Sequence, residues 1–265
     1  MTDIKVFSPI PELRNYVRYY WILKCNERFR ILTFPIGCPQ IIFHRKNPLY
    51  IPELNSHQSR FTISGQVNFP AHIEATDGAD MVVAVFYPHT IGYFINTTPS
   101  AFYNLEISGY DIGDKALDTL AARIMDNDSD VQCITILNNW LLSKLRQQPA
   151  VQEKRIGTAI PIILSNPQTP VYDLAEHACL SKKQFERLFR EYVGMNPKEY
   201  ARVVRFQKSM WLLQQGSRDF TGIACNCGYS DQSHFIREFK SMSGLTPKQL
   251  TATCRPYSDL FTHPA

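Results

Sequence analysis

The sequence predicts an α+β protein with a small N-terminal β-barrel, helices at the C-terminal end of that barrel, and then an all-α domain with two helix-turn-helix units. Three observations predict this architecture. Short β-branched and aromatic runs separated by turn residues fill positions 1–110, helical periodicity begins at Asp114, and one helical pattern occurs twice after residue 170. We place the domains at residues 1–148 and 153–258.

The N-terminal part carries many short runs typical of strands, bounded by Pro, Gly or Asn. They lie at residues 19–23, 30–34, 40–44 and 81–86, with weaker candidates at 60–64 and 72–75. Many short strands with turns between them indicate a barrel or a sandwich.

Two apolar stripes follow the strands at helical spacing. The first consists of Leu117, Leu120, Ala121 and Ile124, and the second of Ile134, Leu137, Leu141 and Leu145. The second stripe is close to a heptad seam, so it is a candidate dimer contact. The alternative is that both stripes pack on their own barrel. The polar, proline-marked stretch at residues 147–152 is the predicted linker.

The C-terminal part contains an internal repeat. Residues 171–200 and 219–250 share an apolar pattern with the same glycine and proline positions. Leu174, Ala175 and Ser181 match Ile223, Ala224 and Ser230 at a separation of 49 residues, while Phe185, Phe189, Gly194 and Pro197 match Phe235, Phe239, Gly244 and Pro247 at 50. A repeat of this kind fixes the architecture, and two copies indicate paired modules.

Each copy predicts a helix, a tight turn and a second helix. In the second copy Gly228 ends the first helix, Ser230 caps the next one, and Gly244 with Pro247 ends it. Between the copies, residues 197–216 predict one helix of about four or five turns that separates the modules. A helix-turn-helix places its second helix in a DNA major groove.

Charge divides the chain in the same place. Residues 1–150 carry 13 Lys and Arg against 14 Asp and Glu, whereas residues 151–265 carry 15 against 10. A positive domain suits DNA phosphate, and its coincidence with the repeat gives this charge weight.

The repeat, its linker helix and the stretch GYSDQSHFIREFKSMSGLTPKQL resemble the DNA-binding domain of AraC/XylS-type transcription regulators. The resemblance covers the C-terminal domain and implies double-stranded DNA as partner. The implied DNA-binding residues are Lys182, Lys183, Glu186, Arg187, Arg190, Gln232, Ser233, Arg237 and Lys240. The base-facing residue of the first recognition helix is bulky or polar-neutral in many members. Here it is Lys183, which opens the alternative of a phosphate contact alone.

The stretch FPIGCPQIIF at residues 34–43 resembles a turn and strand of the cupin-like sensor domains found in some of these regulators. A pocket for a small-molecule effector is therefore expected, although each aromatic residue suits a barrel core equally well. Its candidate lining is Trp21, Tyr50, Phe86, Tyr93 and Phe102. The histidines at 44, 57, 72 and 89 lack the spacing of a metal site, so no metal and no cofactor is expected.

No catalytic motif is present: the sequence contains no nucleophile elbow, P-loop or dinucleotide fingerprint. We therefore expect a regulator and not an enzyme. We expect it in the cytoplasm, because no membrane span or secretory signal is apparent and seven scattered cysteines favour reduced thiols. The resemblance implies a homodimer and, for an activator, a contact with RNA polymerase. The alternatives are an N-terminal domain that binds a protein partner, and an enzyme or sensor domain fused to a DNA-binding module.

Overall fold

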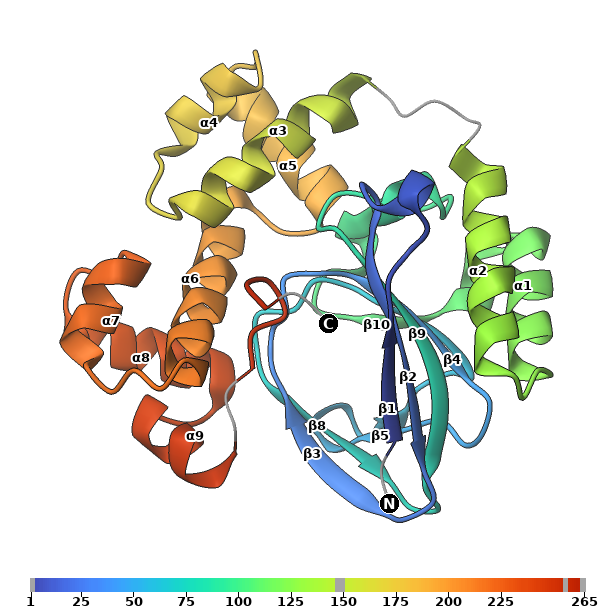
Figure 1. Ribbon diagram of the computed structural model, residues 1–265. Helices are drawn as coiled ribbons and strands as arrows, with labels where there is room; N and C mark the ends of the chain where they lie inside the picture. The colour runs from blue at the N-terminus through green and yellow to red at the C-terminus, as the bar shows by residue number, and fades with distance from the viewer. Residues whose placement is uncertain (1–2, 146–150, 255–256, 263–265) are drawn as a thin grey trace.

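The computed structural model describes residues 3–145, 151–254 and 257–262, and Figure 1 shows a domain of strands followed by a domain of helices. The strands are β1 (Asp3–Phe7), β2 (Val17–Cys25), β3 (Phe29–Thr33), β4 (Gln40–His44), β5 (Tyr50–Ile51), β6 (Ser56–His57), β7 (Phe61–Ser64), β8 (Ala71–Ala75), β9 (Ala79–Phe86) and β10 (Glu106–Ser108). The helices are α1 (Lys115–Met125), α2 (Asp130–Leu145), α3 (Val151–Ser165), α4 (Val171–His177), α5 (Lys182–Val193), α6 (Pro197–Gln214), α7 (Phe220–Cys227), α8 (Gln232–Ser243) and α9 (Pro247–Thr253). All six predicted strands are present, so the β-branched runs identified them correctly.

The strands form two antiparallel sheets. One has six strands in the order β1-β2-β9-β4-β7-β10, and the other has four in the order β3-β8-β5-β6. The chain crosses between the sheets directly after β2, since β3 pairs with β8 and not with β2.

The predicted β-barrel is therefore wrong, because each sheet is open at both ends and no ladder joins the two sheets in the described part of the chain. The cupin-like closure expected from the turn at residues 34–43 is not present either. The physical reason for the error is that barrels and sandwiches give the same alternation of inward and outward residues along a strand. Only the pairing of the end strands distinguishes them.

Each face of the six-stranded sheet contributes to a different apolar core. Tyr20, Ile22 and Val82 point to the face that α1 and α2 cover, while Tyr19, Leu23 and Val83 point toward the second sheet. Figure 1 shows α1 and α2 lying side by side along the outer face. The alternation of buried residues in β2 thus fills two cores at once.

The second apolar stripe packs on its own domain. Ile134, Leu137 and Leu141 are buried in the core between α2 and the six-stranded sheet. This arrangement excludes the seam as a dimer contact in this fold, because its side chains are already covered. Of the two alternatives for this stripe, packing on its own domain is therefore the one that the structure shows.

Ion pairs fix the start of α2 on the edge of the sheet. The Asp130 carboxylate lies 2.8 Å from Lys24 Nζ, 3.0 Å from Lys5 Nζ and 3.0 Å from Arg45 Nη2. Burial alone would raise the pKa of Asp130, but hydrogen bonds from these three cations lower it to about 2. One carboxylate therefore joins α2 to β1, β2 and the end of β4.

The helical domain shares its core with the inner faces of the sheets. A single cluster of buried residues extends from Val83 and Ile42 in the sheet to Phe206 and Phe239 in the helices. At the junction the rings of Phe34 and Phe206 meet edge to face with centroids 6.2 Å apart. The helical domain thus shares its core with the sheets, whereas the N-terminal domain also has a separate core beneath α1 and α2.

Helix α3 begins at Val151, so the last two residues of the predicted linker are helical, and the others, 147–150, lie outside the described residues. Within the described ranges, no helix has the length and apolar character needed to cross a membrane.

Candidate nucleic-acid interface

Helices α4 and α5 form the first helix-turn-helix unit, and α7 and α8 form the second, with α6 between them (Figure 1). The linker helix runs over 18 residues, Pro197–Gln214, as its periodicity predicted. A capping box starts it, because Asn196 accepts the amide of Glu199 at 2.9 Å and Glu199 accepts the amide of Asn196 at 3.2 Å.

The first recognition helix, α5, is strongly amphipathic. Ser181 caps it by accepting the Gln184 amide at 3.3 Å, and Gly194 ends it in the left-handed region with φ +94°. Phe185, Leu188 and Phe189 are buried against the domain. The predicted DNA-contacting residues Lys182, Lys183, Arg187 and Arg190 are all exposed, and Glu186 is half-buried.

The second recognition helix, α8, begins one residue later than predicted. Asp231, not Ser230, is the cap, and its carboxylate accepts the His234 amide at 2.7 Å. This bond holds the pKa of Asp231 below its usual range. The second copy is one residue longer than the first, and with Asp231 as the cap this extra residue lies before the cap. The caps Ser181 and Asp231 are then 50 residues apart, as are the residues of the two helix cores. Ser230 instead places its hydroxyl 3.0 Å from His234 Nδ1.

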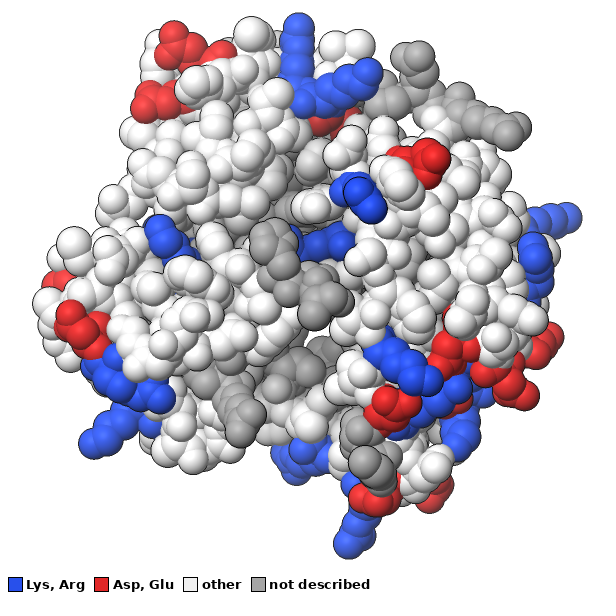
Figure 2. All heavy atoms as spheres, in the orientation of Figure 1, with Lys and Arg blue, Asp and Glu red and all other residues white. Residues whose placement is uncertain are grey.

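The outward side of α8 carries the side chains that were predicted to contact DNA. Gln232, Ser233, Arg237 and Lys240 are exposed, and Gln232 Oε1 accepts the Thr221 hydroxyl at 3.0 Å. Figure 2 shows the helical domain at the left, mostly uncharged on that face, with Lys and Arg both at its lower left and at its upper edge.

Glu238 forms a buried ion network that sequence reasoning missed. Its side chain is 7% exposed and accepts hydrogen bonds from Arg202 Nε at 3.1 Å and from Arg205 Nη2 at 2.9 Å. Both arginines belong to α6, so the network fixes the rotation of α8 on the linker helix. Glu238 is therefore engaged by the linker helix and not by its neighbour Arg237.

The repeat contains a signal for this network. Glu238 aligns with Leu188 of the first copy at a separation of 50 residues, and Leu188 is a buried core residue. A carboxylate at a core position requires a buried cation, and α6 carries Arg202 and Arg205 one turn apart.

The structure does not bring the five residues of the expected effector pocket together. Phe86, Phe102 and Tyr93 belong to the core beneath α1 and α2, whereas Trp21 packs on the opposite side of the sheet. Tyr50 lies in the smaller sheet, where its hydroxyl donates to Asn55 Oδ1 at 2.8 Å.

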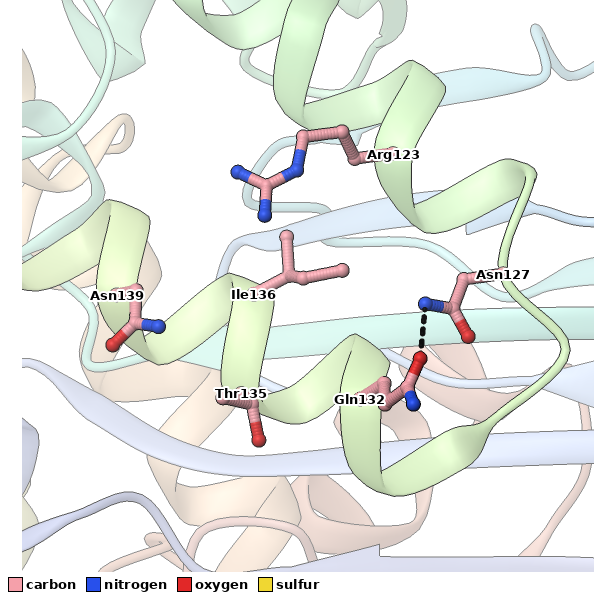
Figure 3. A pocket seen from close by; sticks show the side chains of 6 residues that line it. All are labelled: Arg123, Asn127, Gln132, Thr135, Ile136 and Asn139. Carbon is pink, nitrogen blue, oxygen red and sulfur yellow. Dashed lines mark hydrogen bonds between the residues drawn. The ribbon is translucent and has the colours of Figure 1, made fainter.

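The hollow in Figure 3 lies between α1 and α2 on the outside of the domain. It has a volume of about 420 Å³ and is open to solvent. Across its floor Asn127 Nδ2 donates to Gln132 Oε1 at 2.9 Å. Arg123, Thr135, Ile136 and Asn139 also line it.

The histidines of the N-terminal domain lie apart from one another. His44 is fully buried in β4, the His57 ring is tilted against the Tyr50 ring with centroids 5.0 Å apart, and His72 Nδ1 lies 2.6 Å from Glu53 Oε1. Among the residues that the structure describes, no three His, Cys, Asp or Glu side chains are grouped to hold a metal ion.

Residues 174–253 match a family model described as a helix-turn-helix domain, and residues 5–108 match a second one described as Domain of unknown function (DUF6597). An uncharacterized HTH-type transcriptional regulator of Haemophilus influenzae is 35% identical over 131 residues, which cover 48% of this chain and 44% of the relative. The arabinose operon regulatory protein of Escherichia coli K12 is 26% identical over 136 residues, which cover 48% of this chain and 46% of the relative. The match thus spans less than half the length of each relative.

Among solved structures, an AraC-type regulator from Chromobacterium violaceum is similar, with 28% identity and a TM-score of 0.36, over 38% of this chain and 91% of that chain. ToxT from Vibrio cholerae aligns over 95% of this chain and 96% of its own, with 12% identity and a TM-score of 0.43.

Proposed function

We propose that this chain, whose residues 174–253 belong to the AraC-type helix-turn-helix family, is a transcription regulator that binds specific DNA sequences. The observation that carries the proposal is the pair of capped helices, α5 and α8, whose outward faces are cationic and exposed. One linker helix holds both, as two neighbouring major-groove contacts require.

Each of the two recognition helices supplies both phosphate contacts and base contacts. We assign Lys182, Lys183, Arg190 and Lys240 to phosphate, because flexible ammonium groups and peripheral cations give affinity without sequence preference. We assign Glu186, Arg187, Gln232, Ser233 and Arg237 to base edges in the major groove.

Arg237 is the strongest candidate for base recognition. Its side chain is exposed on α8, and no ion pair or hydrogen bond engages its guanidinium within the described parts of the chain, since the nearby Glu238 is taken by α6. Arg187, its counterpart in α5, is instead 3.2 Å from Glu191. A free guanidinium can donate two parallel bonds to guanine O6 and N7.

Binding-site selection with Arg237→Ala and Lys240→Ala tests these roles. Arg237→Ala should remove the preference at one base-pair position, a loss of about 1–3 kcal/mol of discrimination. Lys240→Ala should weaken all sequences alike and reduce the slope of log affinity against log salt by about one.

Arg28→Ala is the matched control, because it removes an exposed arginine from the segment between β2 and β3 of the N-terminal domain and so changes the net charge equally. Uniform loss of affinity in Arg237→Ala, with all base preferences kept, would contradict the assignment of Arg237.

For the N-terminal domain we propose a regulatory role, with a small-molecule effector as the first alternative and a protein partner as the second. Saturable thermal stabilisation of the full chain by a metabolite would favour the effector. For an activator, RNA polymerase is the expected partner. We propose no catalytic activity and a cytoplasmic site of action.

We further propose a homodimer, in which the outer side of α2 and the hollow of Figure 3 supply the contact. Val131 is 67% exposed there, and Ile136 lines the hollow. Light scattering of the purified chain tests this: a monomer at every reachable concentration would contradict it.

A further inference from the structure

Residues Ser258–Thr262, here called the strap, lie between the two domains. Ser258 is fully buried and Leu260 is 7% exposed. On the N-terminal side, Arg18 Nη2 donates to the carbonyl oxygen of Leu260 at 2.8 Å, and the Tyr19 hydroxyl donates to the Asp259 carboxylate. Both partners belong to β2, so the strap is tied to the second strand of the six-stranded sheet, next to the edge strand β1.

On the other side the strap is tied to helix α6. Gln207 Oε1 accepts the Ser258 hydroxyl at 3.0 Å, and Gln214 Oε1 accepts the Thr262 hydroxyl at 2.9 Å. The amide nitrogen of the same Gln207 donates to the carbonyl oxygen of Pro35 at 2.7 Å. A single buried side chain of the linker helix thus binds both the strap and the N-terminal domain.

Apolar packing closes the same junction. A Cβ added at Gly37 would lie 3.0 Å from Leu260 Cδ1 and 3.3 Å from Val203 Cγ1, so strap, turn and linker helix are in close contact there. Gly37 also has φ +71°, a conformation that suits glycine. The strap therefore has polar and apolar contacts with both domains.

The N-terminal domain also meets the ends of both recognition helices. A Cβ on Gly194, which ends α5, would lie 3.1 Å from the carbonyl oxygen of Pro99, and one on Gly244, which ends α8, would lie 3.7 Å from Pro70 Cγ. Between these two points α6 is the common support of both modules. Long helices bend, so α6 alone does not fix the separation of α5 and α8.

We propose that the strap locks α6 onto the N-terminal domain, which thereby acts as a brace that sets the separation of the two recognition helices. Tyr19, Gln207 and Asp259 are then positioning residues for DNA binding, since none of them reaches DNA itself. The inference rests on the proposed DNA-binding function. Its consequence is that the lock decides which spacing between the two half-sites is accepted.

The adjacent tyrosines of β2 provide a matched test. The Tyr20 hydroxyl is also buried and donates to Asn138 Oδ1 at 2.8 Å, but Asn138 lies in α2 of the same domain. Tyr19→Phe and Tyr20→Phe therefore each remove one buried hydroxyl bond, and only the first removes a bond between domains. Asp259→Ala removes the same bond from the strap side.

The probes are duplexes that carry the selected site with its original spacing, or with one or two base pairs inserted between the half-sites. We expect the wild type and Tyr20→Phe to discriminate strongly against the inserted sites. Tyr19→Phe and Asp259→Ala should reduce that discrimination at least five-fold, with the slope against salt unchanged. Equal discrimination in all four proteins would overturn the proposal.

Calorimetry without DNA separates this inference from the proposed function. The wild type and Tyr20→Phe should unfold in one transition, whereas Asp259→Ala should show two, because the domains lose their coupling. Failure of the wild type to select any DNA sequence would count against the proposed function alone. A single transition in Asp259→Ala would overturn the lock whatever the DNA result.

Discussion

Replacing Glu238 by leucine tests whether the second recognition helix depends on its buried ion network. The change leaves Arg205 without its carboxylate, although its side chain is only 15% exposed. Breaking a buried pair by removing one partner destabilises proteins by about 3–5 kcal/mol. Since Arg202 is 39% exposed and can turn to solvent, we expect a loss at the lower end of this range, about 3 kcal/mol.

The first copy of the repeat suggests how this loss can be restored. Leucine stands at position 188, the counterpart of Glu238, and it is buried. The double variant Glu238→Leu with Arg205→Leu should therefore recover stability to within about 1 kcal/mol of the wild type, because well-packed apolar groups replace a buried ion pair without loss.

Urea unfolding of the wild type, both single variants and the double variant completes the cycle. Glu191→Leu is the matched control, because it breaks the exposed Arg187–Glu191 pair of the first recognition helix, which contributes about 0.5 kcal/mol at most. The reasoning is refuted by a loss below about 1 kcal/mol in Glu238→Leu, or by a double variant no more stable than the single one.

Two further predictions concern the N-terminal domain and its boundary. Leu137→Asp should unfold the domain and not merely dissociate a dimer, since Leu137 is 1% exposed on the inner face of α2; circular dichroism that shows a soluble, folded variant would contradict this. Burial raises the pKa of Glu153 from 4.5 to about 8, so the protonated acid is favoured in the folded state and the free energy of unfolding should fall as pH rises between these values. Glu153→Gln should remove that slope in urea titrations at stepped pH, and an unchanged slope would assign it to other groups.

The sequence determined the parts of this protein that depend on local patterns. The glycines at 194, 228 and 244 end their helices as the repeat predicted. Each has a positive φ, a conformation that the absence of a Cβ makes inexpensive. The repeat likewise located both recognition helices and their exposed cations. Period-2 and period-3.6 patterns need no knowledge of distant residues, which is why these predictions succeeded.

The tertiary structure decided every feature that depends on which segment lies opposite another. The alternation in β2 predicted a half-buried strand, but it could not distinguish an open pair of sheets from a barrel. An apolar stripe such as that of Leu137 predicts only that another surface covers it. In the structure that surface is the six-stranded sheet of the same domain. The cap of α8 is Asp231 and not the predicted Ser230. The sequence could not distinguish them, because Ser and Asp are both favoured caps and stand next to each other here.

The junction between the domains was the least accessible from the sequence. Tyr19 and Asp259 are separated by 240 positions, as are other partners of the strap at similar distances along the chain. No local propensity encodes such a contact, because its free energy arises only after two domains have folded and excluded water from the space between them. The amino-acid pattern thus fixed the helices and strands that this protein forms, and only tertiary packing fixed how the N-terminal domain holds the two recognition helices.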